Sequence, residues 1–241
     1  MDQQENSKLL EAARCLNAVE TICVKKELSK KLTSQPFSYL LVLDFEATCW
    51  SKEDDFKAPN EVIECPCVLY HVETNRIVSE FQLYVRPVEN PILSEFCMKL
   101  TGIRQSQVDG GFPLDVSLML FKKWLEEMRK RFALSYDIYS SAENKCIFAT
   151  WSDWDLGVCL KRESQRKRIT LPEMFTTWID VRAIYCSHYL RKPKGLYGAL
   201  QELGLEFVGR EHCGLDDARN TAKLIGAMLA DGVLLERTPS F

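Results

Sequence analysis

The sequence predicts an α/β fold, with a mixed β-sheet of about five strands flanked by α-helices. Residues Tyr39–Leu43 form an unbroken apolar run, as expected of a strand buried on both faces. Two β-rich runs follow at residues 61–72 and 76–87, and the three residues between them are a hairpin-length connection. Beyond residue 114, helical and strand-like segments alternate. A sheet with helices packed on it accounts for that order.

The overall composition sets limits on the class of protein. With 241 residues, 46% of them hydrophobic and 27% charged, the chain can bury a full core. A net charge of −3 argues against a protein coated in nucleic acid, although local basic patches remain compatible with it. We expect no membrane span and no signal peptide, because the apolar runs are short and the first residues are polar. An intracellular protein of the cytoplasm, the nucleus or both is therefore expected.

The cysteines do not predict a disulfide framework or a zinc site. Ten cysteines are present, but none form a Cys-x-x-Cys pair, and only three histidines accompany them. We expect most of these thiols to be small core residues in a reducing compartment.

The remaining elements follow from periodicity and from residues that stop helices. Residues 1–36 predict one or two amphipathic helices, which we treat as an extension of unknown role preceding a domain at 37–241. Polar residues 51–60 and 133–144 predict loops. Strands are expected at 146–151 and 177–181. Helices are expected at 94–100, 114–132, from 154 through the basic run KRESQRKR, at 182–190, 196–203 and 216–229.

Two acids, Asp44 and Glu46, directly follow the first apolar run. Side chains alternate along a strand, so these two share a face, about 6–7 Å apart. Buried carboxylates repel each other, and a divalent cation between them removes the conflict because hard cations prefer carboxylate oxygens. The alternative is a strand end that reaches solvent, with both acids hydrated.

The segment His212–Asp217 reads HCGLDD and opens the last helix. Helical periodicity places Asp217 on the core-facing stripe with Thr221, Leu224 and Met228, where an unpaired carboxylate is costly. The same periodicity places Asp216, Asn220 and Lys223 on a polar stripe, and Asp216 is expected to be an N-cap or solvated. Asp217 is therefore the candidate ligand.

A histidine and a further pair of acids complete the set of candidates. His212 lies between Gly209 and Gly214, which allow it to move, and a histidine titrates near neutral pH, as proton transfer requires. Its alternative reading is a solvated loop residue. Asp153 and Asp155 lie where a strand passes into a helix. Periodicity does not separate these two acids, and Asp153 is the better N-cap.

This combination resembles the DEDDh group of 3′–5′ exonucleases, which have a ribonuclease H-like fold. The resemblance covers about residues 38–232, and its motifs are residues 44–48, Trp154 with Asp155, and His212 with Asp217. The aromatic–Asp pair assigns Asp155 rather than Asp153. Residues 94–97, 100–103 and 209–217 are similar to the "enhanced RNA interference" exoribonucleases, relatives of the enzyme that trims histone-mRNA 3′ ends. Residues 151–160 and 191–196 look most like the second, shorter member of that subgroup.

The resemblance implies a two-metal mechanism. Asp44, Glu46, Asp155 and Asp217 would hold two divalent cations, Mg²⁺ or Mn²⁺, and His212 would take the proton from the attacking water. The expected reaction is removal of nucleoside 5′-monophosphates from free 3′ ends of RNA. The alternatives are a DNA or short-oligonucleotide exonuclease, and a nucleic-acid-binding scaffold that kept the fold without activity.

Substrate contacts also follow from the resemblance. Ala47 and Thr48 would approach the terminal sugar, and Leu100 and Thr101 the terminal bases. Trp50 or Trp151 would either stack on a base or pack in the core. The expected substrate is single-stranded RNA or RNA with a 3′ overhang, bound by a monomer. The possible RNA backbone contacts are Lys161, Arg162, Arg166, Lys167, Arg168, Arg191, Lys192 and Lys194. For the five residues between 161 and 168, the alternative is a solvated helix end.

Overall fold

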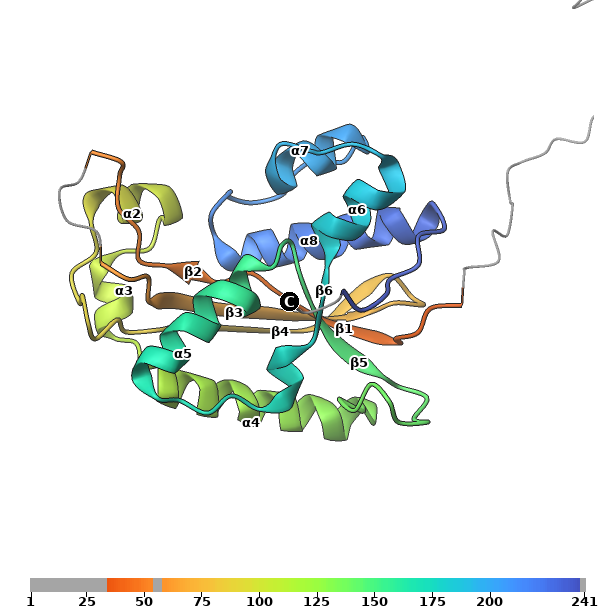
Figure 1. Ribbon diagram of the computed structural model, residues 1–241, viewed down its shortest axis with the longest axis horizontal. Coiled ribbons are helices and arrows are strands. Elements are labelled where there is room, and N and C mark those ends of the chain that lie inside the picture. Colours follow the sequence, from red (N-terminus) through yellow and green to blue (C-terminus); the bar gives the residue numbers. More distant parts are fainter. Residues whose placement is uncertain (1–33, 54–57, 239–241) are drawn as a thin grey trace, which may run out of the picture. The chain divides into compact units, whose positions relative to one another are not determined.

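The computed structural model describes residues 34–53 and 58–238 (Figure 1). The helices expected within residues 1–36 therefore lie almost entirely outside the described residues. Within the described part of the chain, no helix is both long enough and apolar enough to cross a membrane.

A mixed sheet of six strands forms the centre of the fold. The strands are β1 Tyr39–Leu43, β2 Glu46–Ala47, β3 Val62–His71, β4 Arg76–Tyr84, β5 Cys146–Thr150 and β6 Trp178–Asp180. Strand β3 is antiparallel to β1, β2 and β4, whereas β5 is parallel to β1 and β6. The predicted mixed sheet and its antiparallel start are confirmed. The additional strand is β2, which continues β1 along β3 after a gap at Asp44 and Phe45.

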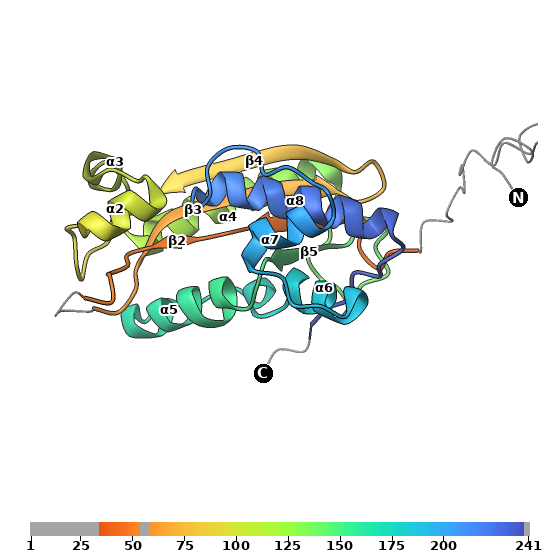
Figure 2. The same cartoon turned by 90° about the horizontal axis from the view of Figure 1, so that it is seen from above.

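Helices cover both faces of this sheet. The helical elements are α2 Glu95–Thr101, α3 Gln105–Asp109, α4 Leu114–Phe132, η1 Trp154–Leu160, α5 Lys161–Lys167, η2 Glu173–Thr176, α6 Val181–Tyr189, α7 Gly195–Glu202 and α8 Gly214–Ala230. Helices α6, α7 and α8 lie on one face and α4 and α5 on the other (Figure 1). In both views α2 and α3 lie at the end of the sheet near β2 (Figure 2). The sequence prediction missed two short elements, α3 and η2.

The alternation of side chains along β1 explains the layers. Leu40 and Val42 pack with α8 residues such as Leu224, whereas Leu41 and Leu43 pack with Phe121 of α4. The apolar run is therefore buried on both faces, as predicted. The pairing with β3 keeps the same register from β1 to Glu46. The side chains of Asp44 and Glu46 are therefore on the same side of the sheet as those of Leu40 and Val42, and α8 covers that side.

The N-cap alternative for Asp216 and the polar-stripe position of Asn220 are both wrong. The helix begins at Gly214 with Cys213 as its N-cap residue, so Asp216 lies inside the first turn and is not the N-cap. Asn220 is buried at 1% exposure, because its side chain bonds both the N–H and the carbonyl of Val208 in the preceding loop. The inward stripe of Asp217, Thr221, Leu224 and Met228 is confirmed, since all four are buried.

Candidate active site

The four candidate acids converge where β1 and β5 end and α8 begins. Asp44 follows β1, Glu46 opens β2, Asp155 lies in η1 directly after β5, and Asp217 lies in the first turn of α8. Glu46, Asp155 and Asp217 are only 8%, 4% and 8% exposed, respectively. The structure thus brings together four acids from three distant segments of the sequence.

Hydrogen bonds hold two of these acids in place. Asp155 Oδ1 accepts the N–H of Phe45 at 2.8 Å, which ties η1 to the peptide between Asp44 and Glu46. Asp217 Oδ2 accepts the N–H of His212 at 2.8 Å. The candidate ligand atoms of Glu46, His212 and Asp217 lie within 4.8 Å of one another. These three side chains therefore frame a position that a cation can occupy.

The shape of η1 explains why periodicity did not separate Asp153 from Asp155. Residues Trp154–Leu160 form a π-helical turn, in which positions do not repeat every 3.6 residues. Asp153 is the N-cap residue, but its carboxylate caps nothing and accepts the indole N–H of Trp178 at 3.0 Å. Asp155 is the acid that faces the cluster.

Burial and mutual repulsion dominate the electrostatics of the cluster. Burial, reinforced by Asp155, Asp217 and Glu46, raises the pKa of Asp44 well above its ordinary value. Burial and its acidic neighbours also raise the pKa of Glu46 to about 9. Burial raises the pKa of Asp155 and of Asp217 to about 7 each. None of the ion pairs found among the described residues includes these four acids. An unpaired, buried set of carboxylates fits hard divalent cations.

A fifth buried acid, Glu64, was missed by the sequence analysis. It is 1% exposed and lies directly opposite Glu46 in the pairing of β2 with β3. Its carboxylate accepts the N–H of Gly214 at 3.1 Å and the side-chain amide of Gln82 at 2.7 Å. Glu64 therefore anchors the start of α8 beside the cluster. The sequence signal for Glu64 was an acid within a β-rich apolar run. The signal for Asp44 was similar, because that acid directly follows an apolar run.

The glycines on either side of His212 are packed closely. A Cβ at Gly214 would lie 2.4 Å from the carbonyl oxygen of Asp44, so this glycine allows α8 to begin against the end of β1. Gly209 has φ +96°, and a Cβ there would lie 2.4 Å from the Asp216 carboxylate. His212 is exposed and has φ +61°, a conformation that a non-glycine residue rarely adopts. Both glycines are thus required by close packing, and whether they also allow His212 to move stays a prediction.

The residues expected to contact the terminal nucleotide lie on β2 and α2. Ala47 and Thr48 are buried, and the thiol of Cys97 on α2 contacts the carbonyl of Ala47 at 3.7 Å. Thr101 is buried and its hydroxyl donates to the Cys97 carbonyl, whereas Leu100 is half-buried. The two segments therefore pack on each other, and Leu100 is more open to solvent than Thr101.

The candidate basic contacts divide into paired and exposed residues. Lys167 is only 13% exposed and bonds the carboxylates of Glu61 and Glu163. Arg166 bonds Glu89 at 3.2 Å and the carbonyl of Asn60 at 2.7 Å, and Arg191 lies 3.6 Å from Glu202. Arg166 and Arg191 are exposed as well as paired, and the exposed candidates outside these ion pairs are Lys161, Arg162, Arg168, Lys192 and Lys194.

Trp154 is the exposed indole beside the acid cluster. It is 39% exposed and adjoins Asp155 in the chain. Trp151, by contrast, packs edge-on against Tyr185 with ring centroids 6.4 Å apart. Trp50 and Trp151 are the indoles predicted either to stack on a base or to pack in the core, and Trp154 is not among them.

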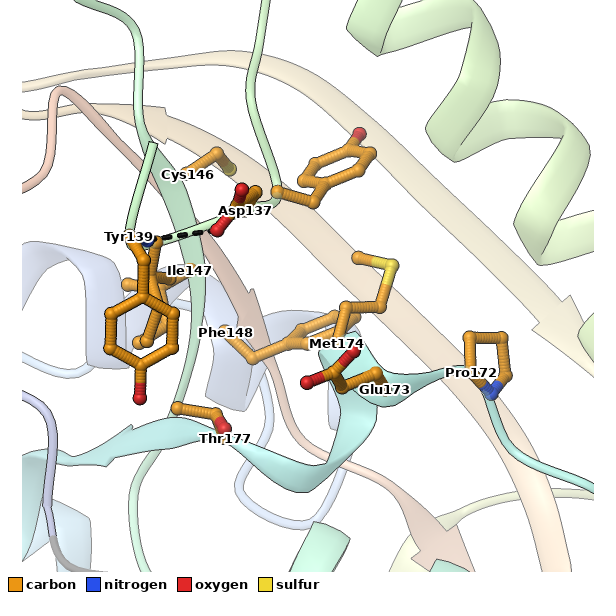
Figure 3. Close-up of a pocket in the computed structure, with 11 residues that line it drawn as sticks. Asp137, Tyr139, Cys146, Ile147, Phe148, Pro172, Glu173, Met174 and Thr177 are labelled. Carbon is orange, nitrogen blue, oxygen red and sulfur yellow. Dashed lines mark hydrogen bonds between the residues drawn. The ribbon is translucent and has the colours of Figure 1, made fainter. Parts of the chain in front are cut away.

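A separate pocket of about 310 Å³ lies at the opposite end of β5 from the acids (Figure 3). Cys146, Ile147 and Phe148 at the start of β5 line it together with Pro172, Glu173 and Met174. In Figure 3 the rings and the Met174 side chain surround the hollow, and the N–H of Tyr139 donates to Asp137 at 2.9 Å. This pocket contains none of the four candidate acids.

Comparison with known proteins adds an independent line of evidence. The sequence model of the family described as Exonuclease matches residues 41–225. The chain is 49% identical over 226 residues to "ERI1 exoribonuclease 2" of Xenopus laevis, covering 92% of this chain and 33% of that protein. It is 44% identical over 229 residues to "3′-5′ exonuclease Snipper" of Drosophila melanogaster, covering 92% and 80%. The chain thus spans about a third of the length of the exoribonuclease 2 relatives.

A solved structure shares the fold. The nuclease domain of 3′hExo, described as a DEDDh family member bound to rAMP, matches with a TM-score of 0.76 and 33% identity. The match covers 85% of this chain and 98% of that domain. The ribonuclease H-like α/β fold and the resemblance to DEDDh exonucleases are thereby confirmed.

Proposed function

This chain belongs to the exonuclease family, and from that premise we propose that it is a 3′–5′ exoribonuclease releasing nucleoside 5′-monophosphates from free 3′ ends. The observation that carries the proposal is the cluster of Asp44, Glu46, Asp155 and Asp217, of which Asp44 is half-buried and the other three are buried. None of the ion pairs found among the described residues includes any of these acids. Residues 37–241 would form the catalytic domain, and residues 1–36 an extension to it.

The four acids fit a pair of Mg²⁺ or Mn²⁺ ions, because all four offer carboxylate oxygens and lack a competing positive charge. Two such ions, when bound, activate the attacking water and stabilise the leaving 3′ oxygen. The protein's own contribution is to hold the acids in place. Asp155 is fixed by the N–H of Phe45, and Asp217 by the N–H of His212.

His212 is proposed as the general base. Its ring lies within 4.8 Å of carboxylate oxygens of Glu46 and Asp217, so it borders the position where the water would be held. The exposure of the side chain allows the proton to pass on to solvent. The Asp217 carboxylate fixes the backbone of His212 and thereby links the base to a proposed metal ligand.

The terminal nucleotide would lie against the end of β2 and the C-terminal end of α2. Backbone at Ala47 and Thr48 and the half-exposed side chain of Leu100 line this position, with Thr101 supporting it from below. Trp154 offers an exposed face on which a base can stack. Exposed Lys161, Arg162, Arg168, Lys192 and Lys194 would contact the phosphates of a single strand or a 3′ overhang.

DNA is the second candidate substrate. The Drosophila relative is named a 3′–5′ exonuclease without reference to RNA, and no residue assigned above reads the 2′-hydroxyl. RNA remains the primary proposal because of the exoribonuclease relatives.

A single gel experiment tests the proposal. The substrates are 5′-labelled single-stranded RNA, the matched DNA, and RNA with a blocked 3′ end, each with Mg²⁺ or with EDTA. We expect a one-nucleotide ladder on unblocked RNA that disappears with EDTA and in Asp217→Asn. The ratio of RNA to DNA rates assigns the polymer. A folded chain that binds RNA but produces no ladder would contradict the proposal and favour a non-catalytic scaffold.

A further inference from the structure

Arg210 joins the loop that carries His212 to the end of α2. Its Nη2 donates to the carbonyl of Lys99 at 2.7 Å and to that of Leu100 at 3.2 Å. The last carbonyls of a helix have no intrahelical partner and lie at the negative end of its dipole. A guanidinium is therefore well suited to this position, although it comes from more than 100 residues further along the chain.

The contact depends on a glycine. A Cβ at Gly102 would lie 1.3 Å from Nη1 of Arg210, so the guanidinium occupies the space that any side chain at this position would fill. Gly102 is also the C-cap of α2 with φ +74°, a conformation that glycine adopts without strain. The end of α2 is thus shaped to receive the arginine.

The other hydrogen bonds of this loop lead to α8. Asp216 accepts the N–H of Arg210 at 3.0 Å, Asp217 accepts that of His212 at 2.8 Å, and Asn220 bonds both polar backbone atoms of Val208. His212 has a left-handed conformation, which persists only where the surroundings impose it. The side chain of Arg210 supplies a link on the opposite side, toward Leu100 and Thr101.

We propose that Arg210 is a positioning residue of the exonuclease site. It holds the loop of His212 and the end of α2 as one unit, so that the proposed base and the segment expected to hold the terminal nucleotide have a fixed separation. The inference rests on the proposed function and deepens it. Arg210 acts through His212, because its guanidinium is engaged by the backbone carbonyls of Lys99 and Leu100.

Steady-state kinetics on single-stranded RNA separate this role from phosphate binding. In Arg210→Ala we expect kcat to fall about tenfold, in the range seen when groups that orient catalytic ligands are removed, with KM within about twofold of wild type. The salt dependence of binding should not change. Arg210→Lys should recover part of kcat, because one ammonium can still reach a carbonyl. Arg129→Ala, on the exposed surface of α4, is the matched control and should behave as wild type.

Two double variants test the coupling. In a His212→Ala background, Arg210→Ala should change kcat less than about twofold, because the arginine acts through the histidine. Gly102→Ala should lower kcat as Arg210→Ala does, although the positive charge remains, and adding Arg210→Ala should then cost little more. A full additional tenfold loss in the His212→Ala background would overturn the proposal. A raised KM with a weaker salt dependence would overturn it too, in favour of a phosphate contact.

Hydrogen exchange gives a readout that does not depend on catalysis. In the full chain, Arg210→Ala should speed amide exchange in peptides covering 208–213 and 98–103 together, and leave α4 unchanged. Unaltered exchange in both peptides would overturn the inference. If the wild-type chain cleaves no nucleic acid, the proposed function fails, and the exchange result still decides whether Arg210 fixes the loop.

Discussion

Glu61 and Glu64 lie three residues apart at the start of β3, but they border two buried acidic clusters of different kinds. Glu61 belongs to an ion-pair cluster with Glu163 and Lys167. Glu64 adjoins the proposed catalytic cluster of Asp44, Glu46, Asp155 and Asp217. Both clusters are buried, so the contrast between them separates the effect of burial from the effect of a missing counter-charge.

One lysine, Lys167, bridges the two glutamates of the ion-pair cluster. Glu61 accepts N–H groups from Val88, Glu89 and Asn90 in addition to Lys167. Burial alone raises the pKa of Glu61, but these bonds outweigh it and the pKa is lowered. In the catalytic cluster burial dominates, and the pKa of Glu46 is raised to about 9. Burial raises an acid's pKa in both clusters, including that of Glu163, and the two clusters differ in that Lys167 supplies a positive charge to only one of them.

The largest expected effect is on activity. Asp217→Asn should lower the rate of RNA cleavage about a thousandfold or more, comparable with removing a charge-stabilising group from an active site. Without metal at pH 8 the variant should unfold at the same temperature as wild type or higher, because one repelling charge is gone. Asp115→Asn on the surface of α4 is the control and should change neither quantity. A thermal collapse of Asp217→Asn would show that the acid is structural.

The reverse pattern is expected in the ion-pair cluster. Lys167→Met leaves Glu61 and Glu163 buried without their partner, which should cost about 3 kcal/mol of unfolding free energy. The kcat of the folded fraction should stay near wild type. Adding Glu61→Gln and Glu163→Gln should restore part of the stability in urea unfolding. A Lys167→Met protein with full stability and no activity would contradict this prediction, because the ion-pair cluster would then be needed for activity and not for stability.

A smaller effect is expected in the pH dependence of stability. The pKa values of Glu46 (ordinary value 4.5, about 9 folded) and Asp155 and Asp217 (3.8, about 7 folded) are raised by folding. The folded state therefore binds more protons, and metal-free stability should decrease as pH rises from about 4 to about 9. Saturating Mn²⁺ should flatten the curve. Metal-free stability that rises over this range would contradict these shifts.

The smallest effect concerns RNA binding by the basic residues near η1. Arg162 is exposed, so Arg162→Ala should reduce the salt slope of single-stranded RNA binding by about 0.7. Lys167 is five residues away, but it is paired with Glu61 and Glu163. Lys167→Met should therefore leave the salt slope unchanged. Equal reductions in both variants would mean that Lys167 leaves its glutamates to bind RNA.

The fold was predictable where local pattern decides it. The apolar run of β1 and the stripe of α4 specify their elements directly, whereas α3 buries only Val108 and offers no such pattern. Asp44 and Glu46 stand out because acids follow an apolar strand, and Asp217 because it falls on a core stripe. Asp155 needed the family resemblance, since its π-helical turn departs from the 3.6-residue period.

The remaining contacts depend on long-range register. Glu64 lies opposite Glu46 only through the pairing of β2 with β3, and these strands are not joined by a tight turn that would set it. Lys167 and Glu163 are an i, i+4 pair and thus locally predictable, but the bond to Glu61 spans 106 residues. The reach of Arg210 to α2 is of the same kind.

The central claim is that the proposed catalytic cluster binds divalent cations. Calorimetric titration of the metal-free chain with Mn²⁺ at pH 7.5 tests this claim most directly. We predict that wild type binds two ions and releases protons, since part of the cluster is protonated at that pH. Glu46→Gln should bind fewer ions and release fewer protons, whereas Lys167→Met should match wild type. No binding to the folded wild-type chain, or equal binding by Glu46→Gln, would contradict the account.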